Sequence, residues 1–263
     1  MCCWATFGTA ATSDKGRAMT FYFLVEDLSG ERLIEQIMKK YIAEMPEYPV
    51  EYCIRSYKGI GGLKRGRDVQ NIKSQQLLND LPKRLSAYQA ELQYFPDTSL
   101  FIVLDNDDRD VNRFRAQLEA LAAERGITID HVFCIAVEEM EAWLLGDLHA
   151  LQKAYPQQAD RIFGKIAAYR QDSICGTWEF LADILTTGGL SQFRKENPSG
   201  HAVGQKRASG RYVLASSCSF GRIAPPAFRR SLENWIAADS VWQSGFPGSE
   251  RFRKPMSFHN AKK

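Results

Sequence analysis

The segment Leu100–Asp110, LFIVLDNDDRD, constrains the fold more than any other part of the chain. Five apolar residues are followed at once by four aspartates within six positions. A short unbroken apolar run is typical of a strand that is buried on both faces, as in a parallel sheet. Open α/β sheets bind their ligands at the carboxyl ends of such strands. We therefore expect a central strand with an acidic cluster at its carboxyl end.

This acidic cluster has two interpretations. Clustered carboxylates repel one another, and a hard divalent cation bound by oxygen ligands would relieve that repulsion. Alternatively, the aspartates mark the N-terminus of a helix, where acidic residues favour the dipole and Asp is a good cap. The two interpretations are compatible, because the residues from Val111 onward have a helical pattern.

Acidic residues follow three of the four strands that the sequence predicts. The predicted strands cover residues 20–25, 50–57, 100–104 and 127–137, with amphipathic helices between them. The acidic residues that follow them are Glu26, Asp105, and the group Glu138, Glu139 and Glu141. This alternation predicts an α/β fold, with a four-stranded, mainly parallel sheet and helices on both faces. The carboxylates should then converge at one edge of the sheet.

Local signals suggest where the helices begin and end. Ser29 is a plausible N-cap for the first helix. The second helical pattern, over residues 72–92, contains Pro82, which predicts an interruption there. Gly126 should end the third helix.

The chain of 263 residues suits one large domain or two of ordinary size. We expect residues 1–18 to form a flexible N-terminal tail, 19–147 an α/β domain, and 148–263 a smaller, mostly helical and irregular C-terminal region. Met19 directly precedes the first strand, so the natural start is either Met1 or Met19.

Composition indicates a soluble globular protein, with 44% hydrophobic and 25% charged residues. A net charge of +3 is too small to indicate nucleic-acid binding by itself. No apolar run approaches the roughly 20 residues of a membrane span, and the N-terminus does not resemble a secretory signal. The six cysteines include no CxxC pair, which favours a cytoplasmic location, and no histidines are paired at zinc-ligand spacing.

Two basic segments are candidates for contact with phosphate. The glycine-rich stretch KGIGGLKRGR includes Lys64, Arg65 and Arg67, and the later GQKR includes Lys206 and Arg207. The first is neither a P-loop nor a dinucleotide-binding fingerprint, so a solvated surface loop is the alternative. An exposed loop lysine is likewise the alternative for Lys206.

Glu26 after one strand and Asp105-Asn106-Asp107 after a later one resemble the TOPRIM pattern, over roughly residues 20–150. That Rossmann-like module occurs in topoisomerases, primases and overcoming-lysogenization-defect nucleases. One departure is Asp27, which stands where the module usually has glycine. Nearly the whole chain also resembles a bacterial family, domain of unknown function 4276, through the segments FLVEDLSGE, VLDNDDRD, IAVEEMEAWLLGD, DSICGTWEFLAD and GQK.

The TOPRIM resemblance implies a role for each candidate residue. Magnesium or manganese would be held by Glu26, Asp105 and Asp107, with Glu138 and Glu141 completing a second metal shell. Two such ions, about 3.5–4 Å apart, activate water and stabilise the leaving oxygen in phosphodiester cleavage. Lys206 would stabilise transition-state charge. Apart from the resemblance, the basic segments themselves suggest that Lys64, Arg65, Arg67 and Arg207 bind nucleic acid.

The leading hypothesis is therefore a metal-dependent TOPRIM-type nuclease acting on DNA or RNA, with a role in phage defence by family analogy alone. One alternative is a non-catalytic module that binds nucleic acid or a partner protein. Another is a different metal-dependent phosphoryl-transfer enzyme. The chain has no ATP-binding motif, so a partner ATPase would have to meet any need for ATP.

Overall fold

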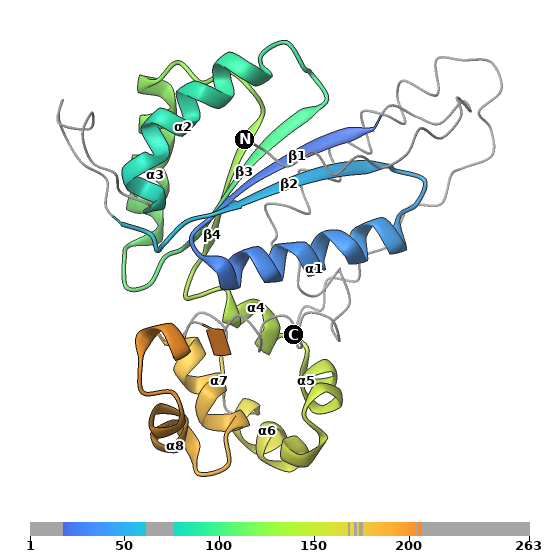
Figure 1. Ribbon diagram of the computed structural model, residues 1–263, viewed down its shortest axis with the longest axis vertical. Coiled ribbons are helices and arrows are strands. Elements are labelled where there is room, and N and C mark those ends of the chain that lie inside the picture. The colour runs from blue at the N-terminus through green and yellow to red at the C-terminus, as the bar shows by residue number, and fades with distance from the viewer. Residues whose placement is uncertain are drawn as a thin grey trace.

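The computed structural model describes residues 18–61, 76–167, 169–170, 173, 176–203 and 205–206 (Figure 1). Within this part of the chain, four strands form one sheet in the order β2-β1-β3-β4. The strands are β1 (Met19–Val25), β2 (Val50–Ser56), β3 (Thr98–Asp105) and β4 (His131–Ala136). Every neighbouring pair is parallel, so the predicted four-stranded α/β fold is confirmed.

The apolar run Leu100–Leu104 forms most of β3, which has a neighbour on each side. All five of its side chains are buried. Burying an aliphatic or aromatic side chain contributes about 1.5–3 kcal/mol, so this run favours the central position. By contrast, β2 lies at one edge of the sheet, and its alternating sequence VEYCIRS is only partly buried.

Helices cover both faces of the sheet (Figure 1). On one face, α1 (Leu28–Glu44) packs its apolar side against Phe21, Phe23 and Phe101. On the other face, α2 (Leu77–Leu92) and α3 (Val111–Glu124) pack against Leu24 and Ile102. Alternate residues of β1, β3 and β4 thus belong to different cores, as the period of a strand requires.

The strand order creates a switch point between β1 and β3. The chain leaves β1 through α1 to reach β2 on one side, and leaves β3 through α3 to reach β4 on the other. Because α1 and α3 cover opposite faces, the connections after β1 and β3 turn to opposite faces of the sheet at its carboxyl edge. In open α/β sheets this is the position where ligands bind. Residues that directly follow these two strands therefore lie where such sheets bind ligands.

The remaining helices lie beyond the carboxyl ends of the strands (Figure 1). They are α4 (Glu141–Leu145), α5 (Leu148–Ala154), the 3-10 helix η2 (Pro156–Gln158), α6 (Ala159–Ile166), α7 (Thr177–Leu185) and α8 (Gly189–Glu196). Their buried residues Leu144, Leu151, Ile162 and Ile184 continue the core on the α1 face. The proposed domain boundary at residue 147 falls between α4 and α5 and stays a prediction. In the described part of the chain, no helix is both long and apolar enough to cross a membrane.

Three local predictions need correction. Asp27, not Ser29, caps α1, because the Asp27 carboxylate accepts a hydrogen bond from the Gly30 N–H at 2.8 Å. Pro82 lies within α2 and does not interrupt it. Burial of the apolar side of α2 offsets the cost of a proline in a helix, about 3 kcal/mol. The fourth strand begins at His131, later than residue 127. Helix α3 ends at Glu124, Gly126 follows with a φ of 63°, and the Ile127 N–H still bonds back to the Ala122 carbonyl.

Candidate active site

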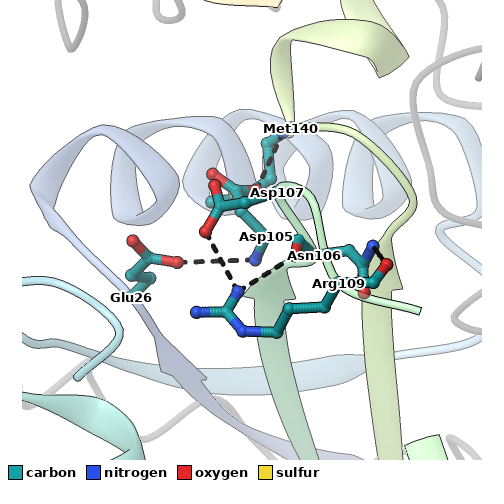
Figure 2. A network of polar contacts seen from close by, with 6 residues as sticks. All are labelled: Glu26, Asp105, Asn106, Asp107, Arg109 and Met140. Carbon is teal, nitrogen blue, oxygen red and sulfur yellow. Dashed lines mark hydrogen bonds and ion pairs between the residues drawn. The ribbon is translucent and has the colours of Figure 1, made fainter. Parts of the chain in front are cut away.

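Glu26 directly follows β1, Asp105 is the last residue of β3, and the two residues contact each other at the switch point (Figure 2). The backbone N–H of Asp105 donates to a carboxylate oxygen of Glu26 at 3.4 Å. Parallel pairing of Val25 with Val103 brings the two strand ends level. The structure thus brings Glu26 and Asp105 together at one edge, as the strand pattern predicted.

Asp105 connects this edge to the next strand. Its side chain is buried, and its Oδ1 atom accepts from the Met140 N–H at 2.9 Å, in the turn that leads into α4 (Figure 2). A carboxylate that accepts a backbone N–H is fixed in direction, and the charge strengthens the bond. Asp105 is therefore a rigid component of the edge.

Asp107 is held in an unusual backbone conformation, with a φ of 54°. This left-handed region is disfavoured for most side chains, although Asp and Asn tolerate it. Two backbone bonds hold the turn, from Asn106 N–H to Ala136 O at 2.9 Å and from Asp107 N–H to Glu138 O at 3.2 Å. The segment after β4 therefore positions the backbone from which the Asp107 carboxylate projects.

Arg109 and Asn106 complete this turn. A guanidinium nitrogen of Arg109 lies 3.0 Å from Asp107 Oδ2 and 2.9 Å from the Asn106 carbonyl (Figure 2). The Asn106 amide nitrogen donates to the Arg109 carbonyl at 2.6 Å. The Asn106 side-chain oxygen, however, is buried without a hydrogen-bond partner among the described residues. An unpartnered buried acceptor is costly, and it is one more hard oxygen beside the two aspartates.

The helix-cap interpretation also holds, but for a different aspartate. Asp110 is the N-cap of α3, and its carboxylate accepts from the Arg113 N–H at 2.8 Å. Asp105 and Asp107 instead bond to Met140 and Arg109. The four aspartates therefore differ: Asp110 is a structural cap, Asp108 is exposed, and Asp105 and Asp107 bond to residues at the sheet edge.

The three glutamates after β4 are all buried, with 3%, 8% and 3% exposure for Glu138, Glu139 and Glu141. Glu138 accepts from the Tyr169 hydroxyl at 2.7 Å. Glu139 accepts from the Thr177 hydroxyl at 3.0 Å and the Trp178 N–H at 2.9 Å, at the N-terminus of α7. Buried carboxylates are costly unless hydrogen-bonded, and these bonds come from the C-terminal helical region.

A model of one protein family matches residues 25–171, more than half of the chain. The chain belongs to this family, Domain of unknown function (DUF4276). The matched DUF4276 segment includes every acidic residue of the candidate site and also Tyr169.

The chain was also compared with solved structures and with curated proteins. Among solved structures, the C-terminal region of the Xanthomonas campestris pv. campestris OLD protein matches with 12% identity and a TM-score of 0.42, covering 85% of this chain and 97% of that one. A likeness of this extent does not determine an activity. No curated protein matches the chain. DUF4276 membership assigns no activity, so the chemistry has to be argued from the site.

The basic residues predicted to act with these carboxylates lie apart from the DUF4276 match or outside the described residues. Lys206 is exposed in a short helical stretch and forms no ion pair with the described carboxylates. Lys64, Arg65, Arg67 and Arg207 lie outside the described residues. The residue that does contact an acid of the site is Arg109, which the sequence analysis did not select. The sequence signal that could have indicated this contact is the position of Arg109 among four aspartates.

The donor set fits a hard divalent cation by its chemistry. Glu26, Asp105, Asp107 and the Asn106 amide all offer oxygen at the carboxyl edge, as Mg²⁺ and Mn²⁺ prefer. Within the described ranges, however, no three His, Cys, Asp or Glu side chains are gathered closely enough to hold a metal. Binding therefore requires side chains to move, above all Asp107 away from Arg109.

Proposed function

We propose that this protein is a metal-dependent, TOPRIM-type phosphodiesterase that cleaves DNA or RNA with Mg²⁺ or Mn²⁺. The observation that carries this proposal is the contact between Glu26 and Asp105 at the switch point of a parallel sheet, with Asp107 on the same turn. Open α/β sheets bind ligands at this position, and hard oxygen donors there suit a phosphate-bound divalent ion. The TOPRIM resemblance implies the same three residues.

Each residue then has a separate task. Glu26, Asp105 and Asp107 hold the ion, which when bound activates water and stabilises the leaving oxygen. Met140 fixes the direction of Asp105 through its N–H. Glu138 and Glu141 contribute to a second metal shell, for which Glu138 would have to exchange its bond to Tyr169. Lys206 stabilises transition-state charge on the phosphate.

The nucleic-acid contacts are assigned to Lys64, Arg65, Arg67 and Arg207. Support comes from the residues that flank the first basic segment, since the Gly59 N–H donates to the Glu26 carbonyl at 3.0 Å and the Leu77 N–H to the Gly59 carbonyl at 3.0 Å. Contacts to phosphate make binding fall steeply with salt. A cytoplasmic location, which the cysteine pattern favours, belongs to this proposal, and so does a partner ATPase, because the chain has no ATP-binding motif. A role in phage defence belongs to it by analogy only.

A second candidate function is a non-catalytic module that binds nucleic acid or a partner protein. It is favoured by one observation, the ion pair between Arg109 and Asp107, which neutralises one acid without a metal. In that case the carboxylates are structural. Another metal-dependent phosphoryl transfer would use the same acids on a different substrate.

Cleavage assays on plasmid, single-stranded DNA and RNA, with Mn²⁺, Mg²⁺ or chelator, test the leading proposal. Glu26→Gln and Asp107→Asn should lower the cleavage rate more than about a hundredfold, because each removes a ligand charge at nearly constant shape. Asp108→Asn is the matched control. Asp108 is exposed one residue away, so its loss of charge should leave the rate within about twofold.

Three outcomes separate the alternatives. Loss of cleavage in Glu26→Gln and Asp107→Asn, with salt-sensitive binding retained, supports the nuclease. Lys206→Ala should then lower the rate more than the affinity. Wild-type protein that binds nucleic acid tightly with Mn²⁺ and cuts no form of it indicates the binding module. Unchanged cleavage in both carboxylate variants would place the chemistry elsewhere.

A further inference from the structure

Arg109 is positioned as an internal cation for the carboxylate that has to move. Its guanidinium bonds to Asp107 Oδ2 at 3.0 Å and lies over the Phe114 ring, 5.2 Å from the ring centre. The backbone around it is fixed, because the Arg109 N–H donates to the Asn106 carbonyl at 3.2 Å and the Asn106 amide donates to the Arg109 carbonyl. The turn therefore keeps Arg109 within reach of Asp107.

The ion pair itself is weak enough to exchange. The side chains of Arg109 and Asp107 are 33% and 41% exposed, and exposed ion pairs contribute only about 0–1 kcal/mol. A divalent cation attracts a carboxylate far more strongly than a solvated guanidinium does. Phe114 offers the released guanidinium a second contact, since a cation over an aromatic ring is favourable by about 0.5–1 kcal/mol.

We propose that Arg109 is a built-in counter-cation, which pairs with Asp107 in the metal-free protein and is displaced when a divalent ion binds at this edge. This inference rests on the proposed function, because it assumes that Asp107 is a metal ligand. Displacement leaves an arginine beside the site with its donors free, and these match phosphate oxygens. Arg109 therefore opposes metal binding and favours the nucleic acid.

The first part of this inference is that Arg109 opposes metal binding. It is tested by Mn²⁺ titration calorimetry without nucleic acid. Arg109→Gln removes the competing cation, so the affinity for Mn²⁺ should rise about two- to fivefold, the range that corresponds to an exposed ion pair. The matched control is Arg113→Gln. Arg113 is exposed, four residues along the same segment, and has no ion pair among the described residues, so its effect is limited to screened long-range charge.

A double-mutant cycle shows whether the effect passes through Asp107. In the Asp107→Asn background, Arg109→Gln should change Mn²⁺ affinity no more than Arg113→Gln does. Nucleic-acid affinity, measured at constant salt with the same variants, should instead fall in Arg109→Gln, because a phosphate donor is lost. Unfolding curves without metal check that each variant is folded.

The results distinguish this inference from the proposal on which it depends. No Mn²⁺ binding by the wild-type protein contradicts the proposed metal site itself. Mn²⁺ binding that is unchanged or weaker in Arg109→Gln overturns the counter-cation role and leaves the metal site standing. A rise in Mn²⁺ affinity that persists in the Asp107→Asn background also overturns the counter-cation role. The rise would then come from the change in net charge and not from the ion pair with Asp107.

Discussion

The acidic residues after β3 and those after β4 lie at the same edge of the sheet but in different surroundings. Asp107 is partly exposed and pairs with a cation, Arg109. Glu138 and Glu139 are buried and accept hydrogen bonds from Tyr169, Thr177 and Trp178 in the C-terminal region. A carboxylate that can exchange its partner is available to a ligand. A buried carboxylate that accepts hydrogen bonds from the C-terminal region connects two parts of the chain.

Asp105 belongs to both groups. It is the last residue of β3 and contacts Glu26, yet it is buried and accepts a hydrogen bond from Met140 on the β4 side. Asp105 thus connects the acidic residues after β3 with those after β4. A change in the β4 segment can therefore alter the position of Asp105 at the edge. The backbone bond from Asp107 to Glu138 adds a second connection.

The largest expected effect on stability comes from Glu139→Ala. The change leaves the Thr177 hydroxyl and the Trp178 N–H buried without their acceptor, at about 1–3 kcal/mol each. We expect the free energy of unfolding to fall by about 3 kcal/mol, and the melting temperature by about 6–12 °C.

The partner variant is Asp107→Asn, which removes only a half-exposed ion pair and retains tolerance of the left-handed backbone. It should cost less than about 1 kcal/mol. Denaturant unfolding of both variants measures the difference. Equal losses would show that the two acidic segments do not differ as their surroundings indicate.

Metal should stabilise the fold through the β3 segment and not through Glu139. By mass action, Mn²⁺ at 100 times its dissociation constant adds about 2.7 kcal/mol to the free energy of unfolding. Asp105→Asn should blunt this shift, since its amide oxygen still accepts from Met140 but the charge is gone. Glu139→Gln should retain it. A full shift in Asp105→Asn would mean that the ion binds elsewhere.

A smaller effect is expected for Tyr169→Phe, which removes a single donor from Glu138. A hydrogen bond to a charged group is typically worth about 1.5–3 kcal/mol, and the ring can keep its stacking on Phe180. We expect a loss near the lower end of that range. Tyr155→Phe is the control, because it deletes a hydroxyl in the same helical region, on a side chain whose pKa is raised by burial and not by an acid. If Tyr155→Phe lowered the free energy of unfolding as much, the loss in Tyr169→Phe would come from removing a buried hydroxyl and not from the hydrogen bond to Glu138.

Much of the fold was predictable from the sequence, because each strand shows its own local period. The apolar run before Asp105 and the alternation in 50–56 both predicted strands that the structure contains. The ends of elements were less accurate, since caps such as Asp27 depend on which side chain reaches a free N–H. The meeting of Glu26 and Asp105 was predictable because parallel strands end at one edge.

The partners of the acids were not predictable in the same way. Tyr169 lies 31 residues from Glu138, and no local pattern connects them. Likewise, Glu138, Glu139 and Glu141 form one acidic run in the sequence, and only the packing of α7 shows that Glu139 is an acceptor for that helix. Arg109 differs, because it is adjacent to the cluster in sequence, yet charge pattern alone does not say which aspartate it contacts.

The smallest expected effect provides the baseline for both segments, at a partly exposed acid in the middle of α1. Glu35 on α1 pairs with Lys39 at 2.9 Å and Arg32 at 3.2 Å. The hydrogen bond from Lys39 is the main reason that the pKa of Glu35 lies below its usual 4.5. A lowered pKa in the folded state means that the pair stabilises the fold above the unfolded-state pKa, and that this contribution disappears as the pH falls through the lowered pKa.

Because solvent screens this pair, Glu35→Gln should cost less than about 0.5 kcal/mol at neutral pH. Below the lowered pKa, where the wild-type carboxyl is itself protonated, the variant and the wild type should be equally stable. Urea unfolding at the two pH values, repeated at high salt, measures this. If Glu35→Gln lowered the free energy of unfolding as much as Tyr169→Phe, the exposure of a carboxylate would not determine how much it contributes to stability in this protein. The contrast between the β3 and β4 segments would then lose its physical basis.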